Sequence, residues 1–298
     1  MAMESMVSSM LGKYLKIFIR GFRKEQLNLS ILRGQYEMKD IEINVDAVNE
    51  LLEYAQVSQV RVRCIRVNSL TVKLSVAKIA SKPITLFIDE VTVEIDEPAS
   101  FDKEAGAGVQ ELLDKLAVKP SKYGLGDRIG DGICVEVNQL KLTFRTCGKR
   151  KVDRVGEWTP PAAVLLAKGI RLFNTDGYGR EGNLDEVWQY NRHRRGAMQV
   201  YLFKRITCAS VEVYLVDERL SPPRIIHGMR EVPVDVDLAL RKLKATSVLT
   251  GVQIEINVDA VSLDFSAPGC LKAFMHFVAG FAFCIFRQGG GAIAGMGA

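Results

Sequence analysis

The amino-acid sequence predicts a mainly β protein, in which an antiparallel sheet makes up most of the fold and helices lie at its margins. Apolar residues alternate with polar ones through most of the 298 residues, which is the period of a strand with one buried face. Segments rich in glycine and proline separate the alternating runs. With 48% hydrophobic and 25% charged residues, the composition is that of a folded chain with a core.

The alternating runs are the candidate strands, and we count about ten to twelve of them by this pattern. Clear examples are "LTVKLSV", "ITLFID", "VTVEID", "VEVNQLKLTF", "VEVYLV" and "VSLDF". Residues 96–108, 174–183 and 217–233 interrupt the runs, and we expect them to be linkers or turns. Twelve strands spaced about 4.8 Å apart would form a sheet roughly 55 Å across.

Helical periodicity is confined to the N-terminus, residues 109–118 and residues 271–286. The N-terminal segment carries Glu4, Lys13 and Lys16 among its apolar residues, so it predicts an amphipathic helix and not a signal peptide. Residues 270–286 are the most apolar stretch, but these 17 residues include a lysine and a histidine. That length is at or below the lower limit of a bilayer span, so a membrane anchor is only an alternative here.

The predicted strands present more apolar surface than three short helices can cover. Either the sheet closes on itself as a barrel or sandwich, or something other than this chain covers its apolar face. A large exposed apolar face would mark an interaction surface.

The sequence offers little support for catalysis, for a metal or for a cofactor. The three histidines lack metal-binding spacing and the six cysteines contain no C-x-x-C pair, which favours scattered thiols in a reducing compartment. "GLGDRIG" (124–130) superficially resembles a dinucleotide fingerprint, but Ile129 replaces the third glycine and no strand leads into it. We expect a flexible turn there. The net charge of +5 is too small to indicate a nucleic-acid binder.

Residues 27–43, "LNLSILRGQYEMKDIEI", resemble the opening signature of the chorein N-terminal region of the bridge-like lipid transfer protein family. Met38 and Asp40 stand where this signature usually has leucine and asparagine. The matching residues are Leu27, Leu29, Ser30, Leu32, Gly34, Ile41 and Ile43.

The resemblance continues through residues 70–95, which include Pro83, although Ser75 and Val76 replace the usual Pro-Trp pair. Residues 122–144 look most similar to the syntaxin-interacting branch, so the resemblance covers most of residues 6–145. It divides the chain into a chorein-type region (1–98), a linker with a short helix (99–132), a continuing β-groove repeat (133–266), and an apolar helix with a low-complexity tail (267–298).

The resemblance implies an elongated, strongly curved antiparallel sheet whose concave side is an apolar groove, capped by the N-terminal amphipathic helix. It also implies a non-enzymatic, cytoplasmic protein, peripheral at membranes and without a cofactor. Such a protein holds glycerophospholipid acyl chains and moves lipids between organelle membranes at contact sites, with its N-terminal end near the endoplasmic reticulum. Protein adaptors are further expected partners, and nucleic acid is not. The alternative is a β-rich scaffold that binds protein partners at membranes without transporting lipid.

Two sets of candidate site residues follow. The groove candidates are the apolar residues of the alternating runs, namely Ile41, Ile43, Leu70, Val72, Leu74, Ile84, Leu86, Ile88, Val91, Val93, Val135, Val137, Leu140, Leu142, Phe144, Ile254 and Ile256. The candidates for contact with membrane headgroups are the basic residues of the N-terminal helix, namely Lys13, Lys16, Arg20, Arg23 and Lys24. These charges could equally be solvated on a helix that only closes the groove.

The octapeptide "IEINVDAV" occurs twice, at residues 41–48 and 254–261. The first copy runs into "NELLEYA", which favours a helical turn or loop after the strand, whereas the second runs into "SLDF", a further alternation. In the second copy, and again between Val137 and Leu140, the apolar alternation steps by three residues. Such a step predicts a bulge or tight bend.

Overall fold

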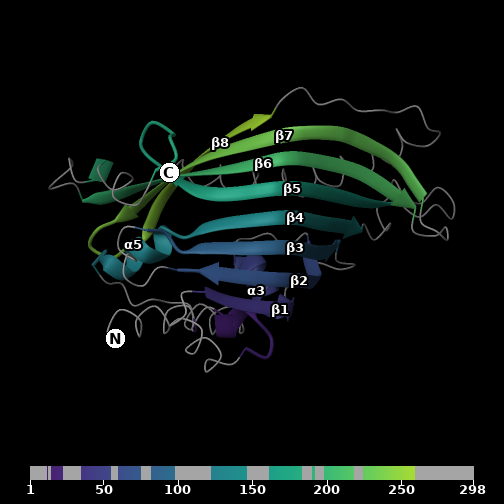
Figure 1. The fold of residues 1–298 in the computed structure, drawn as a ribbon, viewed down its shortest axis with the longest axis horizontal. Helices are drawn as coiled ribbons and strands as arrows, with labels where there is room; N and C mark the ends of the chain where they lie inside the picture. The colour runs from purple at the N-terminus through teal and green to yellow at the C-terminus, as the bar shows by residue number, and fades with distance from the viewer. Residues whose placement is uncertain are drawn as a thin grey trace, which may run out of the picture.

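The computed structural model describes residues 12, 15–22, 35–54, 60–74, 82–97, 122–145, 161–182, 190–191, 198–217 and 224–258. In these residues eight strands form one curved sheet in the order β1 to β8 (Figure 1). The strands are β1 (Gln35–Glu42), β2 (Arg61–Lys73), β3 (Thr85–Asp96), β4 (Cys134–Arg145), β5 (Ala162–Thr175), β6 (Gln199–Asp217), β7 (Arg224–Leu243) and β8 (Leu249–Val258). The sheet does not close, since β1 and β8 are its two edges in the described chain. The predicted mainly β, curved sheet is confirmed.

One neighbouring pair departs from the predicted antiparallel arrangement. β3 and β4 run parallel, whereas the other six pairs are antiparallel. A parallel pair needs a crossover connection, and β4 begins at Cys134 beside Thr85, the first residue of β3. Cys134 N–H then donates to Ile84 O at 2.9 Å, which aligns the two strand starts.

Several strands are longer than the alternating runs indicate. β6 has 19 residues and β7 has 20, and β7 begins at Arg224, inside the segment predicted as a linker. Pro233 is tolerated in β7 because the β6–β7 register shifts between Cys208 and Val211, where a missing N–H costs no regular ladder bond. Eight strands span about 34 Å across the sheet at the usual spacing.

Two helices lie outside the sheet, α3 (Val45–Tyr54) and α5 (Leu125–Asp131). Of the helical turn or loop predicted after the first strand, α3 confirms the helix, which begins at Val45 inside the octapeptide. α5 corrects the flexible turn predicted for residues 124–130. Its glycines have poor helix propensity, but Asp127 Oδ2 accepts the Gly124 N–H at 2.7 Å and Ile129 is only 2% exposed. Capping and burial therefore outweigh propensity.

Of the three predicted helices, the structure describes part of the N-terminal one and does not describe the other two. Residues 15–18 are helical and belong to the predicted N-terminal helix, whereas its first residues, the helix at 109–118 and the helix at 271–286 lie outside the described residues. None of the helices in the described ranges has the length and hydropathy needed to cross a membrane.

In each of the strands β1 to β6 the alternation of apolar and polar residues shifts by one residue, and these shifts lie side by side along a line that crosses the sheet. The ladders omit one shared position in each of these strands, namely Asp40, Asn68, Asp89, Asn138, Gly169 and Ala209. Between β2 and β3 the ladder also omits Ser69 and Glu90. Asp40 and Gly169 have positive φ angles of 51° and 61°. The predicted step between Val137 and Leu140 is part of this line. It is not a bulge of one strand, because the neighbouring strands step together and the β3–β4 register stays constant.

Side-chain amides satisfy polar groups along this line. Asn68 Nδ2 donates to Asp89 Oδ2 at 2.6 Å, and the Glu90 N–H donates to Asn68 Oδ1 at 2.7 Å. Asn138 Nδ2 donates to Asp89 Oδ1 at 2.9 Å. These hydrogen bonds, first from Asn138 and then from Asn68, hold the pKa of the Asp89 carboxyl below its usual value. Asp89 is thus linked to both neighbouring strands across the line of omitted positions, which we call the seam.

Candidate functional site

Two uninterrupted rows of apolar side chains cross all eight strands. Residues directly opposite each other in neighbouring strands lie on the same face of a sheet, so the register defines each row. The first row is Tyr36, Val72, Leu86, Val135, Leu172, Ile206, Val236 and Ile256. The second is Met38, Leu70, Ile88, Val137, Ile170, Cys208, Val234 and Val258.

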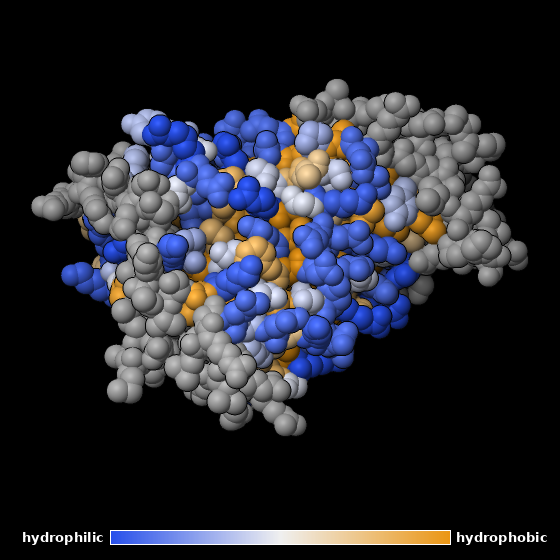
Figure 2. All heavy atoms as spheres, in the orientation of Figure 1, coloured by the Kyte–Doolittle hydropathy of each residue, from blue (hydrophilic) through white to orange (hydrophobic). Residues whose placement is uncertain are grey.

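The rows continue on the other side of the seam. A third row is Ile41, Val67, Val91, Leu140, Ala167, Val211 and Val232. A fourth is Ile65, Val93, Leu142, Leu165 and Val213. We call the surface made by these rows the apolar face. The surface turned to the viewer in Figure 2 is mostly hydrophilic, with hydrophobic residues gathered between the polar ones.

The register places most of the predicted groove residues on the apolar face. The four rows contain Ile41, Leu70, Val72, Leu86, Ile88, Val91, Val93, Val135, Val137, Leu140, Leu142 and Ile256. Phe144 pairs with Ile95 and Ala163 beyond the fourth row, and Ile254 pairs with Leu238 next to the first. Leu74 and Ile84 are buried in the core beside Ile129. Ile43 bridges to Ile19 and packs against the same core.

The sequence missed the contributions of β5 and β7 to these rows. "AAVLLAKGIRLF" in β5 is apolar almost throughout, so periodicity could not assign its faces. In β7, "VPVDVDLAL" does alternate, and this signal could have located Val232, Val234 and Val236 had Pro233 not suggested a linker.

Burial changes greatly along the apolar face. Near β1 and β2 the side chains are buried, with Ile41 at 5% and Val72 at 2% exposure. Leu15, Ile19, Phe22 and Ile129 cover them there. At β8 the apolar side chains are open, with Ile254 at 58% and Ile256 at 63% exposure. The described chain therefore covers one end of the apolar face and leaves the other accessible.

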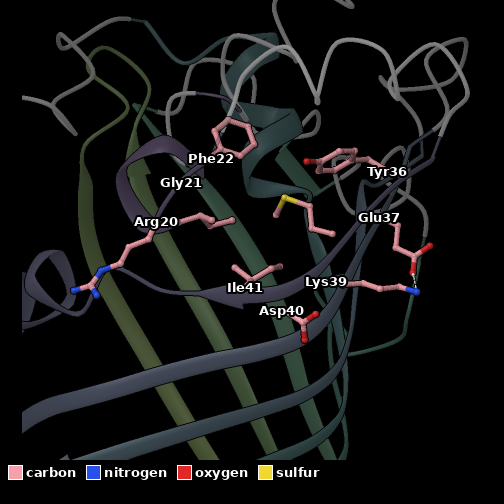
Figure 3. Close-up of a pocket in the computed structure, with 10 residues that line it drawn as sticks. Arg20, Gly21, Phe22, Tyr36, Glu37, Lys39, Asp40 and Ile41 are labelled. Carbon is pink, nitrogen blue, oxygen red and sulfur yellow. Dashed lines mark ion pairs between the residues drawn. The ribbon is translucent and has the colours of Figure 1, made fainter.

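A pocket of about 540 Å³ lies at the covered end, beside β1 (Figure 3). Its apolar lining residues are Ile19, Phe22, Tyr36, Met38 and Ile41, and its charged ones are Arg20, Glu37, Lys39 and Asp40. This volume lies within the range of small-molecule pockets, about 300–1,000 Å³. Burial raises the pKa of the Tyr36 hydroxyl, so it stays a neutral donor. An apolar floor with a charged rim suits an amphipathic ligand.

The structure describes the side chains of two of the five predicted headgroup residues, Lys16 and Arg20. Lys16 is exposed on the N-terminal helix, whereas Lys13, Arg23 and Lys24 lie outside the described side chains. Arg20 donates to Glu42 Oε1 at 2.7 Å and its guanidinium lies 3.8 Å from the Asp46 carboxylate. Its charge is therefore engaged in tying the N-terminal segment to the end of β1.

Helix α5 crosses the ends of the strands and is attached to β7 through polar contacts. Asp131 accepts hydrogen bonds from Lys242 Nζ at 2.6 Å and from the Tyr123 hydroxyl at 2.9 Å. Asp127 accepts one from the Ser247 hydroxyl at 2.6 Å. Burial and the neighbouring Asp131 raise the pKa of Tyr123 far above its usual value. These bonds hold α5 against the β7–β8 turn.

A second partly buried cation, Lys204, lies at the same end of the sheet. Lys204 Nζ donates to Ile133 O at 2.9 Å and to Asn174 Oδ1 at 3.0 Å. Burial lowers its pKa, because desolvation disfavours the charged form. Lys204 alternates with Leu202 and Ile206 along β6, so its side chain lies on the apolar face between these two residues.

The fold and its surface define a class: an open, curved β-sheet whose apolar rows run across every strand. A family model described as bridge-like lipid transfer protein family member 3A/B matches residues 3–149. Over these 147 of its 298 residues the chain matches the bridge-like lipid transfer protein family.

Similar curated proteins carry the same family name. Bridge-like lipid transfer protein family member 3B from Homo sapiens is 21% identical over 257 residues, which are 83% of this chain and 16% of the relative. The protein of that name from Mus musculus is 22% identical over 254 residues, with the same coverage of 83% and 16%. Family member 3A from Homo sapiens is 24% identical over 145 residues, 48% of this chain and 10% of that relative. The chain thus spans about one sixth of the first two relatives.

Proposed function

We propose that this chain holds the acyl chains of glycerophospholipids on its apolar face and transfers lipid between organelle membranes. The observation that carries the proposal is the pair of apolar rows that crosses all eight strands and becomes exposed at β8. An apolar surface of this continuity is unfavourable in water. An acyl chain running along the rows would cover it without any covalent chemistry.

The contacts of α5 support an apolar face on the inner side of the curved sheet. Ile129 packs in the core with Leu74 and Ile84 at β2 and β3, while Asp131, two residues later, binds Lys242 on β7. In a flat sheet β3 and β7 would be about 19 Å apart, and α5 is only about 10 Å long. Curvature toward α5 makes both contacts easy to reach and turns the rows into the lining of a groove.

The remaining parts of the proposal rest on the family resemblance and on the N-terminal segment. We place the protein in the cytoplasm, peripheral at membrane contact sites, with its N-terminal end toward the endoplasmic reticulum. The N-terminal helix caps the groove there, consistent with the packing of Leu15, Ile19 and Phe22 against the core. Lys16 and the basic residues around it contact headgroups, and protein adaptors are further partners. The remaining predicted groove residues line the groove with the rows.

A direct test is the lipid content of the purified chain, measured by mass spectrometry, and its extraction of labelled phospholipid from liposomes. Ile256→Asp places a charge on the apolar face, and we expect bound lipid to fall about tenfold or more, because an unpaired carboxylate in an apolar site is costly. Asn257→Asp is the matched control on the opposite face of β8 and is expected to keep its lipid. A parent chain that neither carries nor extracts phospholipid contradicts the proposal.

The exposed apolar side chains of edge strand β8 also favour a second function, a scaffold that binds another protein. An edge strand with open apolar side chains can accept a further strand. In that case the purified chain would hold a stoichiometric protein partner and no lipid, and Ile256→Asp would release the partner.

A further inference from the structure

The largest exposed apolar side chains of the described residues fall into two groups. One is the apolar row of β8, already assigned to the groove, with Val252, Ile254, Ile256 and Val258. The other is Leu125, Tyr178, Met198, Val248 and Leu249. All members of this second group lie at the edge of the sheet where β4, β6 and β8 begin and β5 and β7 end, the side of α5 in Figure 1.

Four of these residues are held together by backbone contacts between three segments. The Tyr123 N–H donates to Lys244 O and the Lys244 N–H donates to Met198 O, both at 2.8 Å. The Leu243 N–H donates to Val248 O at 2.9 Å. The N-terminus of α5, the start of β6 and the β7–β8 turn therefore form one unit. We call its exposed apolar residues, Leu125, Met198, Val248 and Leu249, the rim tip.

Basic side chains surround the rim tip. Lys122 and Arg241 are exposed and Lys244 is partly exposed. Asp131 is paired with Lys242, whereas Asp127 accepts from the neutral Ser247 hydroxyl and keeps its charge. Lys122, Arg241, Lys242 and Lys244 outnumber these two acids. The local charge is consequently positive around a small apolar centre.

We propose that the rim tip is a membrane-docking surface that inserts its apolar side chains among the headgroups of anionic phospholipids. Met198 is 78% exposed and Leu249 is 48% exposed, so both can enter a bilayer interface without unfolding the sheet. The basic residues match an anionic surface. Four apolar side chains are too few for the roughly 800 Å² per partner of a stable protein interface, which favours a lipid surface over a protein partner. The site is separate from the groove and from the N-terminal helix.

The test is flotation of the full chain with vesicles of phosphatidylcholine alone or with one fifth phosphatidylserine. We expect the parent to float mainly with the anionic vesicles, and Leu249→Asp and Met198→Asp to lose most of that binding. Lys122→Gln and Lys244→Gln should each weaken it roughly fivefold, as expected for one basic residue at an anionic surface.

Asn257→Asp is the matched control, because Asn257 is exposed on the same strand as Leu249, lies near the opposite end outside the rim tip, and does not belong to the apolar rows. It should float like the parent. Leu249→Asp should retain its co-purified lipid. A parent chain without lipid therefore contradicts the groove, whereas the flotation of this variant tests the rim tip. Unchanged flotation of Leu249→Asp with an unchanged unfolding midpoint overturns the proposal, as does an equal loss in Asn257→Asp.

Discussion

The two copies of "IEINVDAV" have the same sequence and different structures. In residues 41–48 the chain leaves β1 after Glu42 and enters α3 at Val45, whereas in residues 254–258 it stays in strand β8. Ile41 is 5% exposed, and its counterpart Ile254 is 58% exposed. Identical side chains thus build a core in one place and an open surface in the other.

The difference arises from contacts outside the repeated letters. The first copy lies beneath Leu15, Ile19 and Phe22, and the Asn44 N–H donates to Phe18 O at 2.8 Å. The first residue after the repeat also differs, Asn49 against Ser262. Asn49 binds both the C=O and the N–H of Val62 at 2.8 Å, which holds α3 against β2. Local sequence therefore permits both structures, and tertiary contacts select one.

The largest expected effect separates Ile41 from Ile254. Ile41→Ala should lower the free energy of unfolding by about 2–4 kcal/mol, because it leaves a cavity in the core. Ile254→Ala should change it by less than about 0.5 kcal/mol, as for an exposed site. Urea denaturation of both variants measures the difference. Equal losses would mean that the two copies are buried alike.

An intermediate effect is expected at Asn49. Asn49→Ala removes both hydrogen bonds to Val62 and should cost about 1–3 kcal/mol, since the backbone groups of the strand end lose their partner. Asn49→Asp keeps the size and the acceptor but loses the N–H donor, so it should cost less than the alanine variant. Ser262→Ala, after the second copy, is the comparison. Thermal unfolding monitored by circular dichroism would contradict this view if Asn49→Ala melted like the parent.

The smallest effect is expected at Glu42 and Glu255, which occupy the same position in the two copies of the octapeptide. Glu42 makes an ion pair with Arg20 at 2.7 Å, but the two side chains are 59% and 48% exposed. Glu42→Gln should therefore cost about 0–1 kcal/mol, and the cost should shrink further in high salt. Glu255→Gln should have no measurable effect on unfolding at either salt concentration. A salt-independent loss at Glu42 would point to a contact other than this ion pair.

Much of the fold was predictable from local pattern. Alternation identified the end of β2, β3 as two separate runs, β4, the end of β6 and the strand part of each octapeptide, and it showed that Leu86 and Ile88, for example, share a face. It failed where the local signal pointed elsewhere: Pro233 suggested a linker in what is β7, and three glycines in residues 124–130 suggested a turn where α5 forms. In both places a non-local contact decided the outcome, a register shift against β6 and the burial of Ile129.

The candidate site was predictable residue by residue but not as a surface. Sequence alone identified apolar positions in single strands, and the family resemblance suggested a groove. It could not show that Val72, Leu86 and Val135 align in one row, because register depends on pairing between distant segments. The rim tip was not predicted at all, since Leu125, Met198 and Leu249 meet only through contacts between three separate segments.

The sequence by itself determined that the protein is mainly β, that the strands with clear alternation have one apolar side, and that its N-terminal half resembles one family. Tertiary structure alone decided that β3 and β4 run parallel, that the seam crosses six strands together, and that one copy of the octapeptide is buried and the other open. The physical reason is the distance along the chain over which each effect acts. Alternation and propensity act over a few residues, whereas register, burial and capping depend on segments that the chain brings together only when folded.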